Sequence, residues 1–203
     1  MTGKYFMEEK LLDSGQKKLV SLIFHLTNGQ KLIYCDARGF GSFRLQILND
    51  YQKLEPYKEI GIDLLNEQVN TDYLFAHYQK RKIPIKTALL EQDVISGIGN
   101  IYASEILFAA RIHPLKKTCE LTYQEVKKIL ILAQSILKEA LELGGTSAFD
   151  FINPLAKKGN YQTKLNVYGR TKKPCYVCHN LIESREINGR NTFFCPQCQR
   201  LEI

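Results

Sequence analysis

The stretch Gly97–Phe108, GIGNIYASEILF, decides how the middle of the chain folds. Its two glycines are spaced as Gly-x-Gly and precede an apolar run, which predicts a tight turn that opens a helix. The first backbone N–H groups of such a helix have no partner within it and can hold a phosphate. A tight turn between two packed helices has the same glycine pattern, so the glycines alone leave both interpretations open.

Apolar residues recur at helical spacing on both sides of this turn. The helix before the turn is expected from Ala88 to about Val94, and the one after it at Ile101–Ala110. An earlier helix is expected to be capped by Thr71-Asp72 and to reach about Gln79. A later helix is predicted to continue to Leu141, because Thr122 and Glu125 fit a capping box before it and Gly144-Gly145 can end it.

The first fifty residues favour β-strands. Lys18–Leu26 is rich in strand formers, Thr27–Gln30 contains the hairpin dipeptide Asn-Gly, and Lys31–Cys35 forms the return strand. Phe43–Leu48 alternates between apolar and polar residues and predicts a further strand. Because two or three strands alone are only marginally stable, we expect this segment to be the end of a larger sheet.

Four of the six cysteines form two pairs, Cys175-x-x-Cys178 and Cys195-x-x-Cys198, with sixteen residues between the pairs. A two-residue spacer lets both thiolates of a pair reach one tetrahedral Zn²⁺ at about 2.3 Å. Ile187–Arg190 can form a turn between the pairs, which predicts a zinc-stapled β-hairpin. The alternatives are disulfides, which suit an oxidising compartment, and a redox centre, which needs only one pair. Four cysteines leave no open position on the metal, so the zinc is expected to be structural.

Composition narrows the class of protein. The 203 residues are 44% apolar and 24% charged, which fits a folded globular chain, and no apolar run is long enough to span a membrane. Met1–Phe6 does not resemble a signal peptide, so a cytoplasmic protein is expected. The two remaining cysteines, Cys35 and Cys119, are expected to be buried apolar residues and not metal ligands. The net charge is +7, and six of these charges lie between Phe151 and Ile203. A basic segment that also holds the paired cysteines predicts a module that contacts phosphates.

Together these motifs resemble the formamidopyrimidine-DNA glycosylases, bacterial enzymes that excise oxidised purines such as 8-oxoguanine and formamidopyrimidines. The resemblance rests on segments in the same order along the chain: Met1–Tyr5, Arg38–Gly41, Gly97–Phe108, Arg111–Pro114, Gly144–Ser147, Leu165–Arg170, and the four cysteines with Gly189-Arg190 before the second pair. It implies an α+β fold with three domains. Residues 1–60 would be the C-terminal part of a β-sandwich, residues 61–163 a helical domain with a helix–two-turn–helix and a lid loop from Ser147 to about Gly159, and residues 164–203 a zinc-finger β-hairpin.

The resemblance also implies DNA-binding roles. Asn100 would bind the backbone beside the lesion, and Lys86 would lie near the damaged nucleotide. Tyr168 and Arg190 would contact phosphates, with the arginine clamping those that flank the extruded nucleotide. From composition alone, Tyr168 could equally be an ordinary strand residue.

Three further residues would fill the hole left by the extruded base. They are Met1, Arg38 and Phe40, and Arg38 would face the orphaned cytosine. A planar guanidinium and apolar wedges can replace lost stacking and pairing. Without the resemblance, Phe40 could be a core residue and Arg38 a surface charge.

The sequence departs from the family at its beginning. Family members start with a proline, whose secondary amine attacks the sugar C1′ and forms a Schiff base, and an adjacent glutamate performs acid–base catalysis. This chain begins Met1-Thr2-Gly3 and contains no counterpart of that pair. We therefore expect the C-terminal three quarters of a DNA glycosylase with AP lyase activity. On its own this chain is expected to be a monomer that holds one structural Zn²⁺ and binds damaged double-stranded DNA without the family's activity. The alternatives are a module whose role is lesion binding without catalysis, and an unrelated zinc-ribbon protein, which would leave Gly97–Asn100 and Leu165–Arg170 unexplained.

Overall fold

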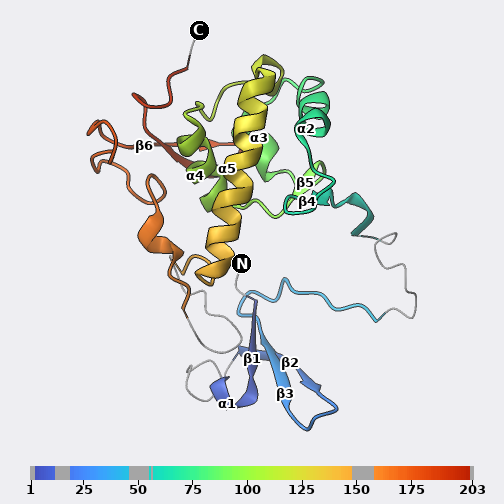
Figure 1. The fold of residues 1–203 in the computed structure, drawn as a ribbon. Helices are drawn as coiled ribbons and strands as arrows, with labels where there is room; N and C mark the ends of the chain where they lie inside the picture. The colour runs from blue at the N-terminus through green and yellow to red at the C-terminus, as the bar shows by residue number, and fades with distance from the viewer. Residues whose placement is uncertain (1–2, 12–18, 46–54, 56, 148–157, 202–203) are drawn as a thin grey trace. The chain divides into compact units, whose positions relative to one another are not determined.

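The computed structural model describes residues 3–11, 19–45, 55, 57–147 and 158–201, and the chain divides into two compact units (Figure 1). The first unit comprises Met1–Leu48 and Glu139–Lys164, and the second comprises Asn49–Lys138 and Leu165–Ile203. None of the helices in the described ranges combines the length and apolar character needed to cross a lipid bilayer. The domain boundaries expected from the sequence stay a prediction.

The first unit contains an antiparallel sheet in the order β1-β3-β2. The hairpin of β2 (Val20–His25) and β3 (Lys31–Cys35) confirms the two strands expected around Asn28-Gly29. Gly29 has φ +82°, which the turn requires and which glycine adopts without strain. Strand β1 (Lys4–Met7), which pairs with the other side of β3, and the short helix α1 (Glu8–Leu11) were not expected from the sequence.

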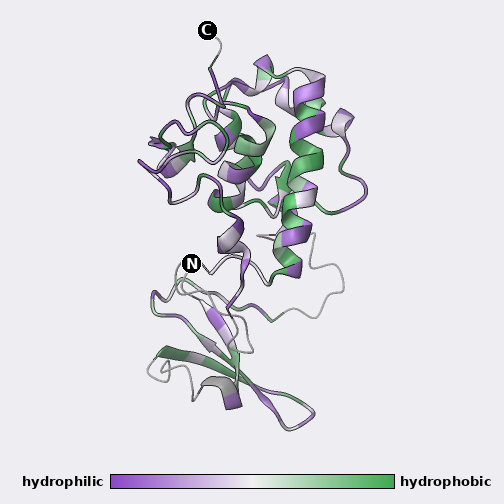
Figure 2. Cartoon of the chain, turned by 60° about the vertical axis from the view of Figure 1, so that its left-hand side comes forward, coloured by the Kyte–Doolittle hydropathy of each residue, from purple (hydrophilic) through white to green (hydrophobic). Residues whose placement is uncertain are grey.

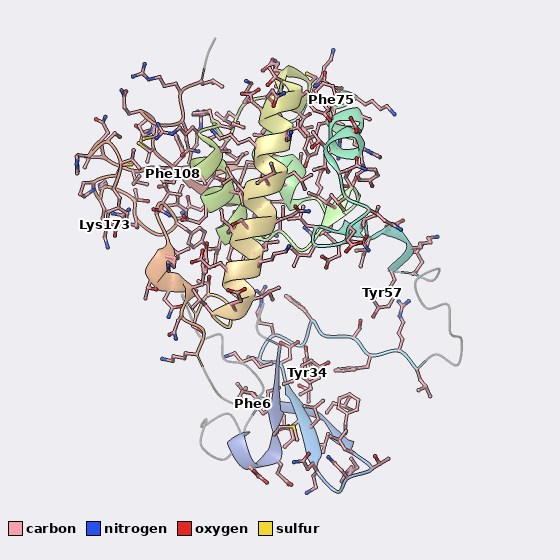
Figure 3. The ribbon with its side chains drawn as sticks, viewed as in Figure 1. Phe6, Tyr34, Tyr57, Phe75, Phe108 and Lys173 are labelled. Carbon is pink, nitrogen blue, oxygen red and sulfur yellow. The ribbon has the colours of Figure 1, made fainter. Side chains whose placement is uncertain are left out.

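The two faces of this sheet differ in their side chains (Figure 3). Phe6, Ile33 and Cys35 are buried together on one face. On the other face, the ring of Phe43 packs against those of Tyr34 and Phe24, at centroid distances of 4.9 and 5.6 Å. The strand expected at 43–48 is therefore wrong for residues 43–45, because Phe43 packs on the sheet face and does not extend the ladder; residues 46–48 lie outside the described ranges.

The helical part follows the predicted pattern with shifted ends. The longer helices are α2 (Thr71–Tyr78), α3 (Ile85–Leu90), α4 (Asn100–Ala110) and α5 (Tyr123–Glu142), and short 3₁₀ helices lie at Tyr57–Glu59, Thr118–Glu120 and Tyr161–Lys164. The capping box before α5 is confirmed, since Glu125 N donates to Thr122 Oγ1 at 3.2 Å and Thr122 N donates to Glu125 Oε2 at 2.8 Å. Gly144 and Gly145, with φ +74° and +83°, follow the end of α5 as expected.

Two helix starts differ from the prediction. The cap of α2 is Asn70 and not Thr71-Asp72, because the Asn70 side chain accepts the N–H of Tyr73 at 2.9 Å. The helix expected at 88–94 begins earlier, directly after Pro84, and ends at Leu90, since Glu91 is extended with φ −73° and ψ 127°. Residues after it form β5 (Ile95–Ser96), which pairs in parallel with β4 (Ile62–Asp63).

Helix α5 supplies the apolar face around which the second unit packs. In Figure 2, apolar (green) and polar (purple) residues alternate along this long helix. Buried residues of α5 pack with those of α3 and α4 in one core, which contains Ala88, Leu89, Ala103, Ile106, Leu107, Val126, Ile129, Leu130, Ala133 and Leu137. Burial of this helical stripe stabilises the second unit and fixes the position of α4.

The C-terminal segment forms the expected hairpin. Strands β6 (Glu183–Ile187) and β7 (Arg190–Phe194) pair in antiparallel register. Asn188 and Gly189 both have positive φ, 49° and 71°, which is the geometry of a tight two-residue hairpin turn. The turn predicted at 187–190 is confirmed.

Candidate nucleic-acid interface

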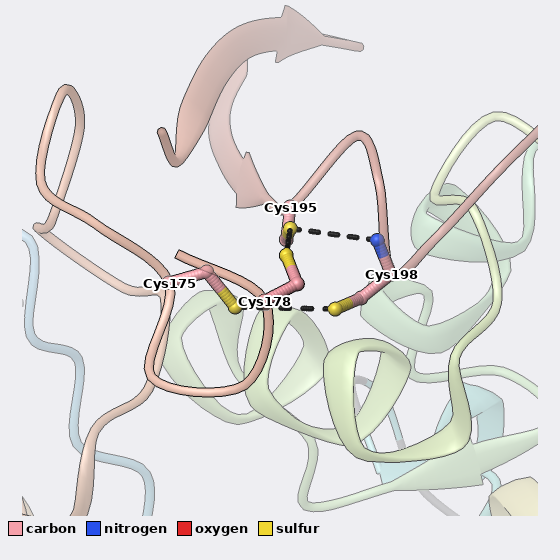
Figure 4. A group of neighbouring side chains, drawn as sticks. All are labelled: Cys175, Cys178, Cys195 and Cys198. Atoms are coloured by element: carbon pink, nitrogen blue, oxygen red, sulfur yellow. Dashed lines mark hydrogen bonds between the residues drawn. The ribbon is translucent and has the colours of Figure 1, made fainter. Parts of the chain in front are cut away.

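The four paired cysteines converge at one point of the second unit (Figure 4). Their sulfur atoms all lie within 4.8 Å of one another, with 3.9 Å between Cys175 and Cys198 and 3.4 Å between Cys178 and Cys195. Four sulfurs at about 2.3 Å from a tetrahedral Zn²⁺ lie about 3.8 Å apart, so this cluster has the size that zinc requires. The donor set is complete with four thiolates, and the zinc is structural.

Backbone N–H groups support the thiolates. Val177 N donates to Cys175 Sγ and Cys198 N donates to Cys195 Sγ, both at 3.4 Å. These bonds spread the negative charge that four thiolates bring to one metal. The other two cysteines lie outside the cluster, and the prediction that both are buried holds for Cys35 but is wrong for Cys119, which is only half-buried.

The zinc hairpin shares a small core with α4. Phe108 of α4 is buried with Val167, Ile182 and Phe193, on the side of α4 that faces the hairpin (Figure 3). The ring of Tyr168 lies 4.7 Å from that of Phe193. The zinc hairpin and α4 therefore pack as one body, and their surface residues keep fixed relative positions.

Gln199 connects the zinc site to the segment after α4, which was not expected from the sequence. Its fully buried side chain accepts the N–H of Cys195 at 3.0 Å and donates to the carbonyl of Ile112 at 2.9 Å. A buried glutamine beside a metal-ligating knuckle has no distinctive sequence pattern, because its partners are backbone groups far along the chain.

The Gly-x-Gly turn is held by a side chain from the preceding segment. Gln92 accepts the N–H of Gly97 at 2.9 Å and donates to the carbonyl of Ile98 at 3.1 Å. Gly97 has φ +100°, a conformation that favours glycine, and Gly99 caps α4 without any side-chain hydrogen bond. The first N–H groups of α4 therefore lack a capping side chain, as the phosphate interpretation requires.

Asn100, the first residue of α4, connects the turn to the zinc hairpin. Its Nδ2 donates to the carbonyl of Asn191 in β7 at 3.0 Å, and its Oδ1 is buried without a partner among the described residues. Asn191 is the neighbour of Arg190. The contact thus brings Asn100 and the start of β7 to the same part of the second unit.

Lys86 lies on α3 and is fully buried. Its Nζ donates to the Asn100 carbonyl and to Ser104 Oγ, both at 2.8 Å. Burial lowers the pKa of Lys86 to about 7, and the negative charge of Glu105 opposes this shift. The ammonium group therefore supports the first turn of α4 from inside and does not face solvent.

The two expected phosphate contacts are accessible. Tyr168 is half-buried on Phe193, and Arg190 is exposed at the start of β7, next to the hairpin turn. Within the described part of the chain, the Arg190 guanidinium forms no ion pair. It is therefore available to an anion from outside the protein.

The first unit carries the expected wedge residues on a loop organised by Asp36. The Asp36 carboxylate accepts the N–H groups of Arg38 and Gly41, at 3.1 and 2.9 Å, and the hydroxyl of Tyr34 at 3.2 Å. The Arg38 guanidinium lies over the Phe40 ring, 4.7 Å from its centroid, and Phe40 is 68% exposed. Phe40 is thus not a core residue. Met1, the third wedge residue, lies outside the described ranges.

The expected lid also lies mostly outside the described ranges, and its two ends are close together. Gly159 N donates to Ser147 Oγ at 2.9 Å, and Ser147 N donates to Gln162 Oε1 at 3.0 Å. A Cβ on Gly159 would lie 2.2 Å from the carbonyl oxygen of Gly145, so only glycine permits this approach.

Comparison with known proteins agrees with this arrangement. The family model described as the formamidopyrimidine-DNA glycosylase H2TH domain matches residues 60–151, and the one described as a zinc finger found in FPG and IleRS matches residues 172–201. The chain is 37% identical to the formamidopyrimidine-DNA glycosylase of Oceanobacillus iheyensis, over 98% of this chain and 70% of the relative. It is 38% identical to that of Cytobacillus firmus, over 98% of this chain and 72% of the relative.

Solved structures give the same result. The MutM (Fpg) protein of Thermus thermophilus matches with a TM-score of 0.85 and 33% identity, over 98% of this chain and 73% of that chain. Lactococcus lactis Fpg in complex with DNA that contains an abasic site matches with a TM-score of 0.86 and 35% identity, over 99% and 73% of the two chains. By its zinc site, its fold and its sequence, the chain belongs to the formamidopyrimidine-DNA glycosylase family.

Proposed function

We propose that this chain binds damaged double-stranded DNA as a monomer and belongs to the base-excision repair of oxidised purines, including 8-oxoguanine and formamidopyrimidines. The observation that carries the proposal is that α4, residues 165–168 and the zinc hairpin pack into one body. That body holds Asn100, Tyr168 and Arg190 together. The DNA complex of the Lactococcus lactis relative, which has the same fold, supports it.

Each part of this body suits a phosphate backbone. The Arg190 guanidinium is exposed and forms no ion pair with any described residue, so it can bind two phosphate oxygens at once. The uncapped start of α4 adds backbone N–H groups and the positive end of a helix dipole. Lys86 does not face the DNA; its buried Nζ donates to the carbonyl of Asn100 and holds the first turn of α4 in place. We infer that these groups hold the strand on both sides of the extruded nucleotide.

The first unit supplies the groups that replace the extruded base. Taking a base out of the stack costs a few kcal/mol, and an inserted side chain can recover part of it. The Arg38 guanidinium lies over the Phe40 ring and both residues are exposed, so the two side chains already lie together at the surface. In this proposal the Arg38 guanidinium bonds to the orphaned cytosine, with Met1 as the third member of the wedge.

We propose that these 203 residues do not carry out base excision themselves. The family's reaction uses the amine of an N-terminal proline and an adjacent glutamate, and no such proline–glutamate pair occurs within these 203 residues. We propose that the 203-residue chain binds the lesion without cleaving the glycosidic bond or the strand. The test is borohydride trapping on a duplex with one abasic site. An imine between a protein amine and C1′ forms with loss of water, and borohydride reduces it to a stable amine; a trapped adduct would contradict the proposal.

DNA binding is tested by fluorescence anisotropy on the same duplex and on an undamaged one, at several salt concentrations. The unaltered chain should bind the abasic duplex more tightly. Arg190→Ala should weaken binding to both duplexes and reduce the slope of log K against log salt by about 1, because one phosphate contact is lost. Lys127→Ala removes the same charge from an exposed position on α5 and is the matched control. An Arg190→Ala slope equal to that of the control would remove Arg190 from the DNA surface.

A further inference from the structure

Glu105, in the middle of α4, is a buried carboxylate whose partners are almost all backbone groups. Glu105 is only 2% exposed. Oε1 accepts the N–H groups of Val167 and Tyr168 at 3.0 and 2.8 Å, and Oε2 accepts the N–H and the Nδ2 of Asn166 at 2.8 and 3.3 Å. No lysine or arginine among the described residues lies within ion-pair distance of this carboxylate. Its charge is thus balanced by hydrogen bonds.

The segment that Glu105 holds has no regular structure of its own. Residues 165–168 belong to no helix or strand, so their backbone N–H groups need partners from elsewhere. One carboxylate provides partners for three consecutive N–H groups. Arg170 binds a carbonyl of the same segment: its guanidinium donates to the carbonyl of Asn166 and also to that of Pro174. The conformation of this segment is therefore set by two side chains of opposite charge.

This segment places Tyr168 on the surface of the zinc hairpin. Val167 is fully buried against Phe108, and Tyr168 follows it onto Phe193. The same helix α4 carries Asn100, which bonds to β7 beside Arg190. Helix α4 is thus the common support of the tyrosine, the asparagine and the hairpin arginine.

We propose that Glu105 is a positioning residue for DNA binding, which sets the Tyr168 side chain at the phosphate backbone by holding the N–H groups of residues 166–168. Glu105 itself touches no DNA. The inference rests on the proposed function, because it assumes that Tyr168 contacts DNA.

The test compares Glu105→Gln with Glu142→Gln, which makes the same change at an exposed glutamate near the end of α5. A glutamine has one acceptor oxygen and turns an NH₂ group toward backbone N–H donors, so at least one of the three loses its partner. We expect Glu105→Gln to retain one zinc per chain and to bind the abasic duplex roughly ten- to a hundredfold more weakly. The control should bind like the unaltered chain.

A double-mutant cycle separates positioning from general stability. If Glu105 acts through Tyr168, adding Glu105→Gln to Tyr168→Phe should cost little more affinity than the stronger of the two single changes. Fully additive losses, or unchanged binding by Glu105→Gln, would overturn the proposal. If Glu105→Gln fails to hold zinc, the proposal is tested instead by amide hydrogen exchange of the unaltered protein. Slow exchange at Asn166, Val167 and Tyr168 is expected, and fast exchange there would contradict the proposal. Failure of the proposed function is a different result, namely no DNA binding by the unaltered chain.

Discussion

Replacing Lys86 by methionine tests the electrostatics of the second unit most directly. Methionine has a similar length and no charge, so the change removes the ammonium group from a fully buried site. It leaves no acceptor without a partner, because Ser104 Oγ also donates to the Asn100 carbonyl, at 3.2 Å. The two acceptors of the ammonium thus continue to pair with one another.

The magnitude follows from the pKa of Lys86. Burial lowers this pKa from 10.5 to about 7, so the unfolded chain binds more protons than the folded chain between pH 7 and 10.5. The free energy of unfolding therefore rises with pH across that window, and the cost of the buried charge is fully present below pH 7. A shift of this size corresponds to about 5 kcal/mol in total, of which roughly 3 kcal/mol falls between pH 6 and pH 9.

The assay is urea unfolding at pH 6, 7, 8 and 9, followed by far-ultraviolet circular dichroism, with zinc present throughout. Lys86→Met should be more stable than the unaltered chain at pH 6, and the difference should shrink by roughly 3 kcal/mol by pH 9. Lys127→Met, at an exposed position, should show no such trend. A difference between Lys86→Met and the unaltered chain that stays constant with pH would refute the reasoning, because the ammonium would then titrate normally in the folded protein.

Two further substitutions test the zinc hairpin and its attachment. Cys178→Ser should abolish stoichiometric zinc binding and unfold β6 and β7, because the metal's binding energy is part of the folding energy, whereas Cys119→Ser should keep one zinc; atomic absorption and circular dichroism measure both. Gln199→Leu should lower the free energy of unfolding by about 2–4 kcal/mol, since it leaves the Cys195 N–H and the Ile112 carbonyl buried without partners. Equal melting temperatures for Gln199→Leu and the unaltered chain would mean that water replaces the side chain.

The sequence predicted those elements whose determinants are local. The capping box of Thr122 and Glu125, the Asn-Gly turns and the paired cysteines each act over a few residues, and all of them form as expected. One prediction failed because a distant group decides: the strand expected from Phe43 is absent at residues 43–45, where that ring packs on the sheet face. The error at α3 has a local cause, because this helix begins directly after Pro84, earlier than the apolar spacing indicated.

The sequence by itself determined the family, the zinc ligands and the candidate DNA contacts, because each rests on residue types at fixed spacing. Only the tertiary structure showed that Lys86 points inward to Asn100, that Glu105 organises residues 166–168, and that Gln199 joins the zinc site to the segment after α4. These three side chains are buried polar groups. Such groups are stable only when partners far along the chain satisfy them, and that pairing is settled when the elements pack.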